Sequence, residues 1–395
     1  MPAFSTIVIG KGLVGAAAAK YLAAAQPGVA VIGPDEPTDY ATATVFASHY
    51  DQARVLRRIG RDAISTRLNA DAAREYPAIQ AEAGIDFHGP VGSLYVIPDG
   101  TGEYLDSAPA LSAKFGVPFT AYASGRALMD DFGAFRFPAS AQGVFEPAPA
   151  GFINPRALIQ AQLALFQRRG GTALRETVVA VSHADGLFQV RTREGHRYAA
   201  PRVLVAAGSF INLCGLIPRP LSLVSKSEVV LLARVSAAQA ATLAGLPSLR
   251  YNIDDGETEG IYLIQPVRYP DGAWYLKMGC NMPEDVFFER LADAQAWFQT
   301  GDSDRFIPRL ARALRALLPA LVVEAYLTKR CVISRSAHGR PYIGETDRAG
   351  LFVAGGCNGN SAMSSDAIGS VAAHLMTQGG LPPSYAPDAF ELVWS

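Results

Sequence analysis

Short apolar runs alternate along the chain with longer stretches of helical character, and the first such pair is the clearest. Residues 6–9 (TIVI) are followed by the glycine-rich segment 10–15 (GKGLVG) and then by four alanines. This order predicts a buried strand, a tight turn and a helix. Gly10 permits the turn, Gly12 leaves room for a pyrophosphate, and Gly15 lets the helix pack on the strand. The pattern therefore predicts a dinucleotide site at the positive N-terminus of the helix.

A second strand is predicted at residues 29–32 (VAVI). Such a strand should end at an acidic residue that holds the ribose hydroxyls of the dinucleotide, but Gly33 stands there. Asp35 and Glu36 follow closely, so either carboxylate, or a backbone group, could take this role. Both could equally be plain turn residues between two prolines.

Further elements are predicted along the rest of the chain. Asn154 followed by Pro155 indicates the start of an amphipathic helix over 154–170. A nucleotide-binding sheet resumes at 151, which makes 86–150 an insertion. Strands are predicted at 92–97, 177–181, 188–192, 202–209 and from 351, with a last helix over 364–376.

Composition narrows the class of protein. The chain has 395 residues, 49% of them hydrophobic, and a formal net charge of −1, which excludes disorder and coiled coils and argues against a nucleic-acid partner. Four cysteines and six histidines show no metal-ligand spacing, so we expect no metal and no disulfide framework. The N-terminus lacks a signal-peptide pattern, and Lys20 and Tyr21 interrupt the small-residue run 13–25. We therefore expect a cytoplasmic protein without a membrane span.

Several motifs occur in an order that is specific when they are taken together. They are the 10–15 glycine turn, the segment with His49, Arg54 and Arg57, the strand end Ala206-Ala207-Gly208, Lys277, Cys331, and the glycine-rich loop 355–359. With these motifs the whole chain resembles the D-amino-acid-oxidase-like flavoprotein superfamily, and within it the monomeric sarcosine oxidase group.

The resemblance implies FAD as the dinucleotide and an α/β (α+β) fold of two discontinuous domains. A Rossmann-like FAD-binding domain would comprise 1–85, 151–220 and 328–395. A substrate-binding domain, built on a mostly antiparallel sheet, would comprise 86–150 and 221–327. Expected contacts with FAD are made by Gly10, Gly12, Leu13, Val14, Gly15, Asp35, Glu36, Ser48, His49, Arg54, Val179, Ala207, Gly208, Cys331, Gly356, Asn358, Gly359, Asn360 and Met363.

Residues 48–57 resemble the family's loop-to-helix motif beside the flavin, with one extra residue near His49. The spacing of three predicts that Arg54 and Arg57 share a helix face. By resemblance Arg54 lies near the flavin and Arg57 grips the substrate carboxylate, a task that suits a planar guanidinium. The alternative is an ordinary solvated face that also includes Arg58 and Arg61.

Lys277 lies in the apolar strand-like segment 273–279, where a buried ammonium would be costly unless something used it. By resemblance its charge would stand over the flavin N5 edge and promote reduction of O2. The alternative is an edge lysine that reaches solvent.

Cys331 follows Lys329 and Arg330, and these cations should lower the pKa of its thiol. By resemblance it would form a thioether with the flavin, and the alternative is an inert buried cysteine.

By resemblance the loop before the last helix lies against the flavin, and the helix N-terminus would stabilise negative charge on the reduced ring. The family's second carboxylate-binding lysine is replaced by Met363, which puts a sarcosine-sized substrate in doubt. Expected substrate contacts are Arg57, Tyr262, His338, Asn360 and Met363.

The resulting prediction is a flavoenzyme that oxidises the C–N bond of an amine or amino acid, secondary or N-substituted amino acids included. Lys277 and Arg57 are the predicted catalytic residues, O2 the expected acceptor, and a monomer or small homo-oligomer the expected state. Two alternatives remain open. One is an amino-acid dehydrogenase that passes electrons to a quinone or a protein, and the other is a flavin-binding homologue without turnover.

Overall fold

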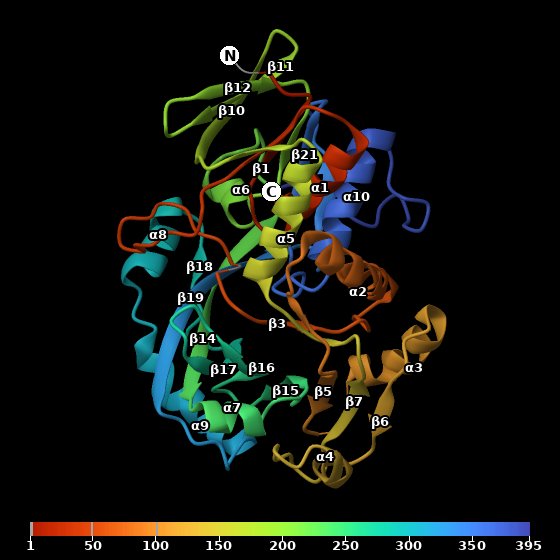
Figure 1. Cartoon of the computed structure of the whole chain (residues 1–395), viewed down its shortest axis with the longest axis vertical. Helices are drawn as coiled ribbons and strands as arrows, with labels where there is room; N and C mark the ends of the chain where they lie inside the picture. The colour runs from red at the N-terminus through yellow and green to blue at the C-terminus, as the bar shows by residue number, and fades with distance from the viewer. Residues whose placement is uncertain (1–2, 49, 100–101) are drawn as a thin grey trace.

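The upper half of the molecule in Figure 1 is built on a sheet of six strands. This computed structural model describes residues 3–48, 50–99 and 102–395. The strands lie in the order β20-β21-β13-β1-β2-β9 and are parallel except for β20. Their bounds are β1 Thr6–Ile9, β2 Val29–Ile32, β9 Thr172–Leu174, β13 Val203–Val205, β20 Tyr342–Glu345 and β21 Leu351–Gly355. The strand, turn and helix predicted from residue 6 are confirmed, and the sheet is Rossmann-like.

Alternate residues of β1 are buried on opposite faces of this sheet, as a fully covered parallel strand requires. Val8 contacts the helical layer formed by α1 (Leu13–Ala25), α2 (Ala63–Ala83), α5 (Pro155–Arg168) and α10 (Ser365–Gln378). Ile7 and Ile9 face a small antiparallel sheet of β10 (Val178–Ala184), β11 (Leu187–Thr192) and β12 (Arg197–Ala200). The short helix α6 (Phe210–Leu213) follows β13.

The lower half contains a sheet of nine strands that is antiparallel except for one pair. Its order is β18-β14-β17-β16-β15-β5-β7-β6, with β19 paired to β14. The bounds are β5 Ser93–Ile97, β6 Thr120–Tyr122, β7 Gln142–Glu146, β14 Leu223–Val235, β15 Ser248–Asp254, β16 Glu259–Arg268, β17 Trp274–Asn281, β18 Phe287–Phe288 and β19 Ala325–Ser336. The predicted mostly antiparallel sheet is therefore confirmed.

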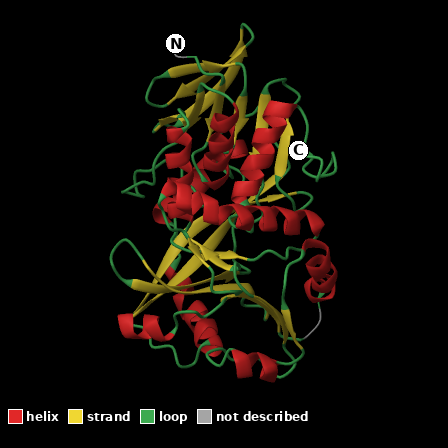
Figure 2. Cartoon of the chain, turned by 45° about the vertical axis from the view of Figure 1, so that its right-hand side comes forward, coloured by secondary structure: helices red, strands yellow, loops and turns green. Residues whose placement is uncertain are grey.

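Helices flank this lower sheet, and Figure 2 shows some of them below it. The apolar side of α9, with Leu310 and Leu314, packs against Leu231 and Met278 of the sheet. The helices between successive strands of this sheet include α3 (Glu103–Phe115), α4 (Gly125–Asp131), α7 (Ala237–Thr242), α8 (Leu291–Thr300) and α9 (Ile307–Leu317), with a 3-10 turn at Asp304–Phe306.

The long strands β14 and β19 lie side by side along the height of the molecule (Figure 1). The strands of the two large sheets fall in the sequence ranges predicted for the two domains, except that β19 spans the boundary drawn at residue 328. The division of the chain into domains stays a prediction.

The helix predicted around Arg54 and Arg57 is wrong. Arg54–Leu56 form strand β3, which pairs with β8 (Gly151–Ile153), and β8 also pairs with β4 (His88–Gly89). The chain is extended here because the backbone of β3 bonds to β8, and the N–H groups of Arg58 and Ile59 donate to Glu146. The strand at 151 therefore belongs to this small sheet and not to the nucleotide-binding one.

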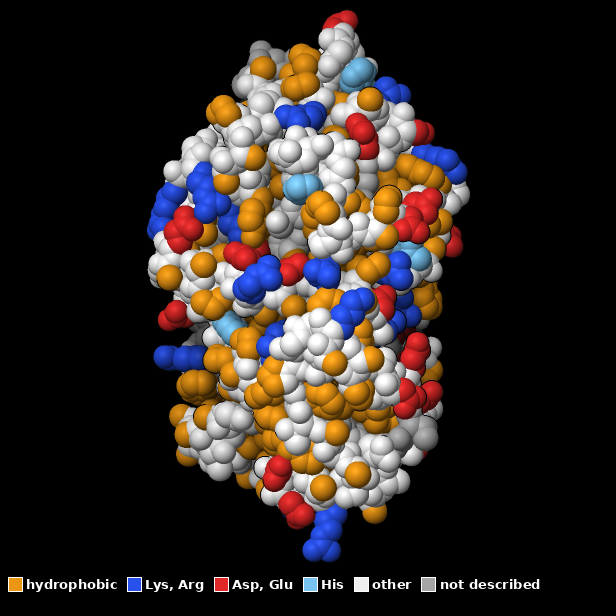
Figure 3. All heavy atoms as spheres, turned by 90° about the vertical axis from the view of Figure 1, so that its right-hand side faces the viewer, with side chains coloured by type: hydrophobic (Ala, Val, Ile, Leu, Met, Phe, Trp, Pro, Cys, Tyr) orange, Lys and Arg blue, Asp and Glu red, His pale blue; other side chains and the backbone are white. Residues whose placement is uncertain are grey.

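Basic and acidic side chains are interspersed over the face shown in Figure 3, as the net charge near zero would suggest. Within the described ranges, no helix is both long and apolar enough to cross a membrane.

Candidate active site

One cavity of about 750 Å³ runs from the glycine turn of the upper half to the face of the lower sheet. This volume is in the range of sites that hold cofactors and small molecules. Its wall includes residues 9–14 and 32–34 at one end, and Arg57, Tyr95 and Tyr262 at the other. A single space can therefore hold an extended dinucleotide together with a substrate.

At the nucleotide end, two glycines are required by close backbone contacts. Gly10 has φ +104, and a Cβ there would clash with the carbonyl oxygen of Ala206. A Cβ on Gly15 would clash with the carbonyl oxygen of Gly10. Gly12 caps α1 without any side-chain hydrogen bond, so the first N–H groups of the helix stay available for a phosphate. These features fit a bound dinucleotide.

The two acidic candidates for the ribose contact are engaged elsewhere. Asp35 forms ion pairs with Lys11 and Arg175, and Glu36 binds the guanidinium of Arg156 through Nε at 2.7 Å and Nη2 at 2.5 Å. Neither carboxylate lies on the cavity wall. The missing acidic residue also has a steric reason, because a Cβ at Gly33 would stand 2.7 Å from the backbone nitrogen of Lys11.

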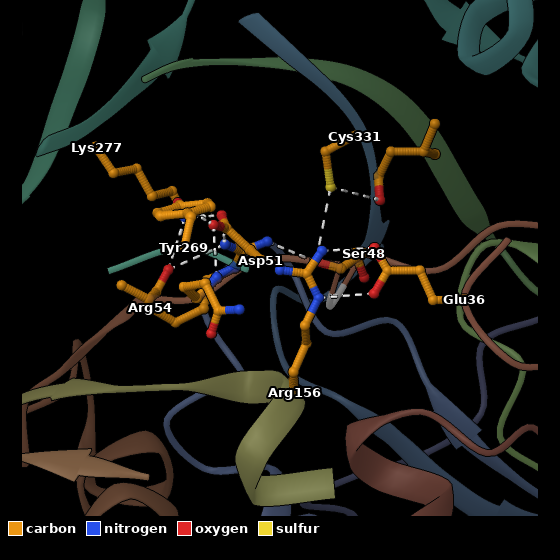
Figure 4. A network of polar contacts seen from close by, with 11 residues as sticks. Glu36, Ser48, Asp51, Arg54, Arg156, Tyr269, Lys277 and Cys331 are labelled. Atoms are coloured by element: carbon orange, nitrogen blue, oxygen red, sulfur yellow. Dashed lines mark hydrogen bonds and ion pairs between the residues drawn. The ribbon is translucent and has the colours of Figure 1, made fainter. Parts of the chain in front are cut away.

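Lys277 is fully buried and belongs to a polar cluster around Asp51 (Figure 4). Its Nζ lies 2.5 Å from Asp51 Oδ2 and donates to the carbonyl oxygen of Ala53 at 2.8 Å. The hydroxyl of Tyr269 donates to Asp51 at 2.5 Å, and Arg54 forms an ion pair with the same carboxylate. The interpretation of Lys277 as a solvent-reaching edge residue is therefore wrong.

Burial and neighbouring charges set the protonation of this cluster. Burial and the charge of Arg54 lower the pKa of Lys277 to about 8, although Asp51 opposes the shift. Burial alone would raise the pKa of Asp51, but the charges of Lys277 and Arg54 hold it well below its usual range. Asp51 is therefore ionised, and the charge on Lys277 changes within a few pH units of neutrality.

The prediction that cations lower the pKa of the Cys331 thiol is wrong, since burial raises this pKa. Side chains alternate along β19, so Arg330 points to the other face and donates to the carbonyl of Gly301. Lys329 lies 5.5 Å from the ring of Tyr269. The cations that do act on this thiol are Arg54 and, to a smaller extent, Lys277, and both moderate the increase. Cys331 is one of the residues that line the cavity.

Arg57 stands at the far end of the cavity among aromatic rings. Its guanidinium carbon lies 4.8 Å from the ring centre of Tyr104 and 5.2 Å from that of Tyr95, and the two rings stack at 3.9 Å. Its buried Nη1 has no hydrogen-bond partner among the described residues. An unpaired buried donor of this kind is suited to an anionic ligand.

The glycine-rich loop before α10 is held in place by hydrogen bonds of the Asn358 side chain. Asn358 has φ +55, accepts from the backbone N–H of Ser336 at 3.0 Å and donates to the carbonyl of Gly356 at 2.6 Å. Met363 is buried on the cavity wall, and its carbonyl accepts from the Tyr76 hydroxyl at 2.7 Å.

Most of the predicted site residues meet on the cavity wall. These are Gly10, Gly12, Leu13, Val14, Ser48, Arg54, Arg57, Ala207, Gly208, Tyr262, Cys331, Asn358, Gly359, Asn360 and Met363. Those that do not line it are Gly15, Asp35, Glu36, Val179, Lys277, His338 and Gly356. His49 is outside the described residues.

The reasons for these absences differ. Gly15 and Lys277 are packed directly behind the wall, and Thr177 and Val178 line it in place of Val179. His338 is exposed, and its Nε2 contacts the carbonyl of Glu391 at 3.0 Å.

Four further residues of the site were not predicted from the sequence: Asp51, Tyr95, Glu228 and Arg250. Asp51 lies three residues before Arg54 in the same motif, so an acidic residue beside the predicted arginine could have been recognised from the sequence. The others come from the lower sheet, and only its strand pairing brings them to the cavity.

Fold and cavity together define a two-part protein that binds a dinucleotide beside a small-molecule pocket. Residues 5–375 match the family profile described as FAD dependent oxidoreductase. The chain belongs to this family of FAD-dependent oxidoreductases. A search of curated proteins found no significant match.

Solved structures of the same fold cover nearly the whole chain. NikD, an unusual amino acid oxidase essential for nikkomycin biosynthesis, has a TM-score of 0.78 and 18% identity, over 100% of this chain and 98% of its own. L-proline dehydrogenase from P. horikoshii has a TM-score of 0.76 and 18% identity, over 99% and 97%. Glycine oxidase from Geobacillus kaustophilus has 0.71 and 17%, over 100% and 99%. At these identities the likeness shows the fold alone.

Proposed function

We propose that this protein is an FAD-dependent oxidase of the C–N bond of an amine or amino acid, with secondary and N-substituted amino acids included. The observation that carries the proposal is Arg57 on the wall of the cavity that begins at the dinucleotide turn, with a buried Nη1 that has no hydrogen-bond partner among the described residues. A substrate carboxylate bound to Arg57 would lie at the end of the cavity opposite the glycine turn, beyond the space for the dinucleotide. The structural neighbours, which include an amino acid oxidase and a glycine oxidase, support the same class.

Each part of the chain has a role in this proposal. Bound FAD supplies the acceptor for the hydride that leaves the substrate carbon next to nitrogen. The glycine turn and the N-terminus of α1 would hold the pyrophosphate, and Arg57 would bind and orient the carboxylate. Tyr95, Tyr104 and Tyr262 shape an aromatic pocket that excludes water. Lys277 would place a positive charge behind the wall, where it favours the reduction of O2 to peroxide.

Anaerobic mixing of the purified yellow protein with a panel of N-methyl and cyclic amino acids tests the proposal. Bleaching by at least one compound, followed by peroxide on admission of air, is the expected result. A protein that binds flavin but is bleached by none of these compounds would be a homologue without turnover.

A dehydrogenase is the second candidate, because Lys277 does not line the cavity and is held by Asp51 and Ala53. Bleaching and dye reduction with little peroxide would favour it. L-proline dehydrogenase shows that the fold accommodates a dehydrogenase.

We also propose that Cys331 carries the flavin through a thioether, since this cysteine is one of the residues that line the cavity. The yellow colour should then stay in the pellet after acid precipitation, and Cys331→Ala should release it to the supernatant. Cys280→Ala is the matched control, because Cys280 is buried on β17 away from the cavity. Colour released from the unmodified protein would show a noncovalent flavin.

A further inference from the structure

The floor of the substrate end is a row of residues across the lower sheet. Arg250 on β15 is the direct strand partner of Tyr95 on β5 and of Tyr262 on β16, and Tyr262 in turn pairs with Gly279 on β17. Side chains of directly paired residues point to the same face of a sheet. Tyr95, Arg250 and Tyr262 accordingly all line the cavity.

This row brings Arg250 close to Arg57. The guanidinium of Arg57 lies over Tyr95, the ring that stands beside Arg250 in the sheet. The proximity also appears in the pKa of Arg250, which is lowered first by burial and then by the like charge of Arg57. Arginine stays protonated in proteins, so two positive charges share this end of the cavity.

Neither guanidinium has a carboxylate partner within ion-pair distance among the described residues. Glu228 and Glu259 also line the cavity and partly offset the decrease in the pKa of Arg250, but neither forms an ion pair with it, and Glu228 pairs with Lys226 at 3.3 Å. Two cations that face one partly buried space repel each other unless an anion lies between them.

The position of Arg250 is built into the backbone. Its Nη1 donates to the carbonyl of Gly260, and a Cβ on Gly260 would clash with its Nη2. Gly260 also has φ +60, a conformation that favours glycine. The strand thus leaves room for this guanidinium at the cavity.

We propose that Arg250 is a specificity-determining residue that binds, together with Arg57, a single carboxylate of the substrate. The inference rests on the proposed function and deepens it. It also accounts for Met363, since the second cation comes from β15 and not from the loop before α10. Arg250 contacts substrate only through this carboxylate, so it governs binding and not the transfer of the hydride.

The test measures binding of two unreactive ligands, propionate and succinate, to the purified holoprotein by calorimetry and by the visible flavin spectrum. Arg250→Met and Arg57→Met should each weaken propionate about 10- to 100-fold, in the range expected for a charged hydrogen-bonding partner. Because both arginines bind the same carboxylate, the double variant should weaken propionate binding by less than the product of the two single-variant factors. Arg268→Met, an exposed arginine on β16, is the control.

A second variant keeps the test valid if Arg250→Met does not retain flavin. Gly260→Ala should displace the Arg250 guanidinium and weaken propionate binding. Gly272→Ala is its matched control, because Gly272 has a similar φ of +82 and only a distant neighbour.

Two results would overturn this inference without affecting the proposed function. One is unchanged propionate binding in the Arg250 and Gly260 variants. The other is weaker binding of succinate only, which would show that Arg250 binds a second carboxylate. Unmodified holoprotein that binds no carboxylate and is bleached by no amine would overturn the proposed function as well.

Discussion

At the scale of single residues, the protonation of Lys277 is the property that the structure defines most sharply. Lys277 is buried between Asp51, which favours its charge, and Arg54, which opposes it. Burial and Arg54 prevail, so its pKa is lowered to about 8. The charge that is proposed to assist O2 is therefore lost at mildly alkaline pH.

We expect the rate at which O2 reoxidises the photoreduced protein to fall as pH rises through about 8. Stopped-flow measurements need no substrate for this test. Lys277→Arg should remove the decline, because arginine stays charged, whereas Lys277→Met should be slow at every pH. An identical pH profile in Lys277→Met would exclude this role.

The same shift has a consequence for stability. Between about pH 8 and the ordinary value of 10.5, the unfolded chain binds a proton at Lys277 that the folded chain does not. The free energy of unfolding should therefore gain a contribution that increases with pH in this range.

At the scale of elements, the helical layer is held by a buried polar cluster as well as by small residues. Lys20 of α1 lies 2.6 Å from Asp366 of α10, which also accepts from Tyr21 at 2.7 Å and from Gln162 of α5 at 3.1 Å. The cluster joins α1, α5 and α10, three of the four helices of this layer. Lys20 and Asp366 compensate each other's charge, so removal of one of them leaves a buried charge.

Asp366→Ala should lower the free energy of unfolding by about 3–5 kcal/mol, because Lys20 would remain buried without a counter-charge. Urea unfolding with and without flavin measures this loss. Replacing Lys20 by Met and Asp366 by Leu together should cost less than the single change. Asp293→Ala, which removes an exposed pair with Arg290, should have little effect. A negligible loss for Asp366→Ala would show that water reaches this cluster.

At the scale of the whole molecule, residues 86–150 help to position the substrate end of the cavity. Glu146 on β7 accepts from the backbone N–H groups of Arg58 and Ile59, both at 2.9 Å. The turn that carries Arg57 is thereby attached to the lower sheet. Tyr95 and Tyr104, whose rings contact the guanidinium of Arg57, come from the same segment.

Glu146→Gln keeps the shape of the side chain but has only one oxygen to accept these two N–H groups. Arg57 should then be held less firmly, so its contact with the substrate carboxylate should weaken. We expect KM to rise about tenfold, the effect of weakening one charged hydrogen bond, with little change in kcat. Steady-state kinetics with a substrate from the amino-acid panel measures this split. Glu103→Gln, an exposed change on α3, is the control. A fall in kcat at constant KM would contradict a positioning role.

The sequence alone was sufficient for the local elements. The 6–9 strand, the glycine turn, the helix at Asn154 and the last helix are encoded in contiguous residues, where apolar spacing and turn chemistry act over short distances. The glycine turn also indicated the dinucleotide. The same reasoning was wrong for residues 54–57. Two arginines three positions apart are compatible with a helix, but this spacing gives no information about the partner strand β8.

Only the tertiary structure decided which side chains meet on the cavity wall and behind it. Lys277 contacts Asp51, Arg156 takes up Glu36, and Arg250 stands beside the tyrosine that Arg57 covers. These pairs join segments far apart in the chain. Lys277 and Arg250 depend in addition on the register of β17 and β15, because a slip of one residue would turn either side chain to the opposite face of the sheet. That register is set by packing of the whole molecule and not by any local pattern.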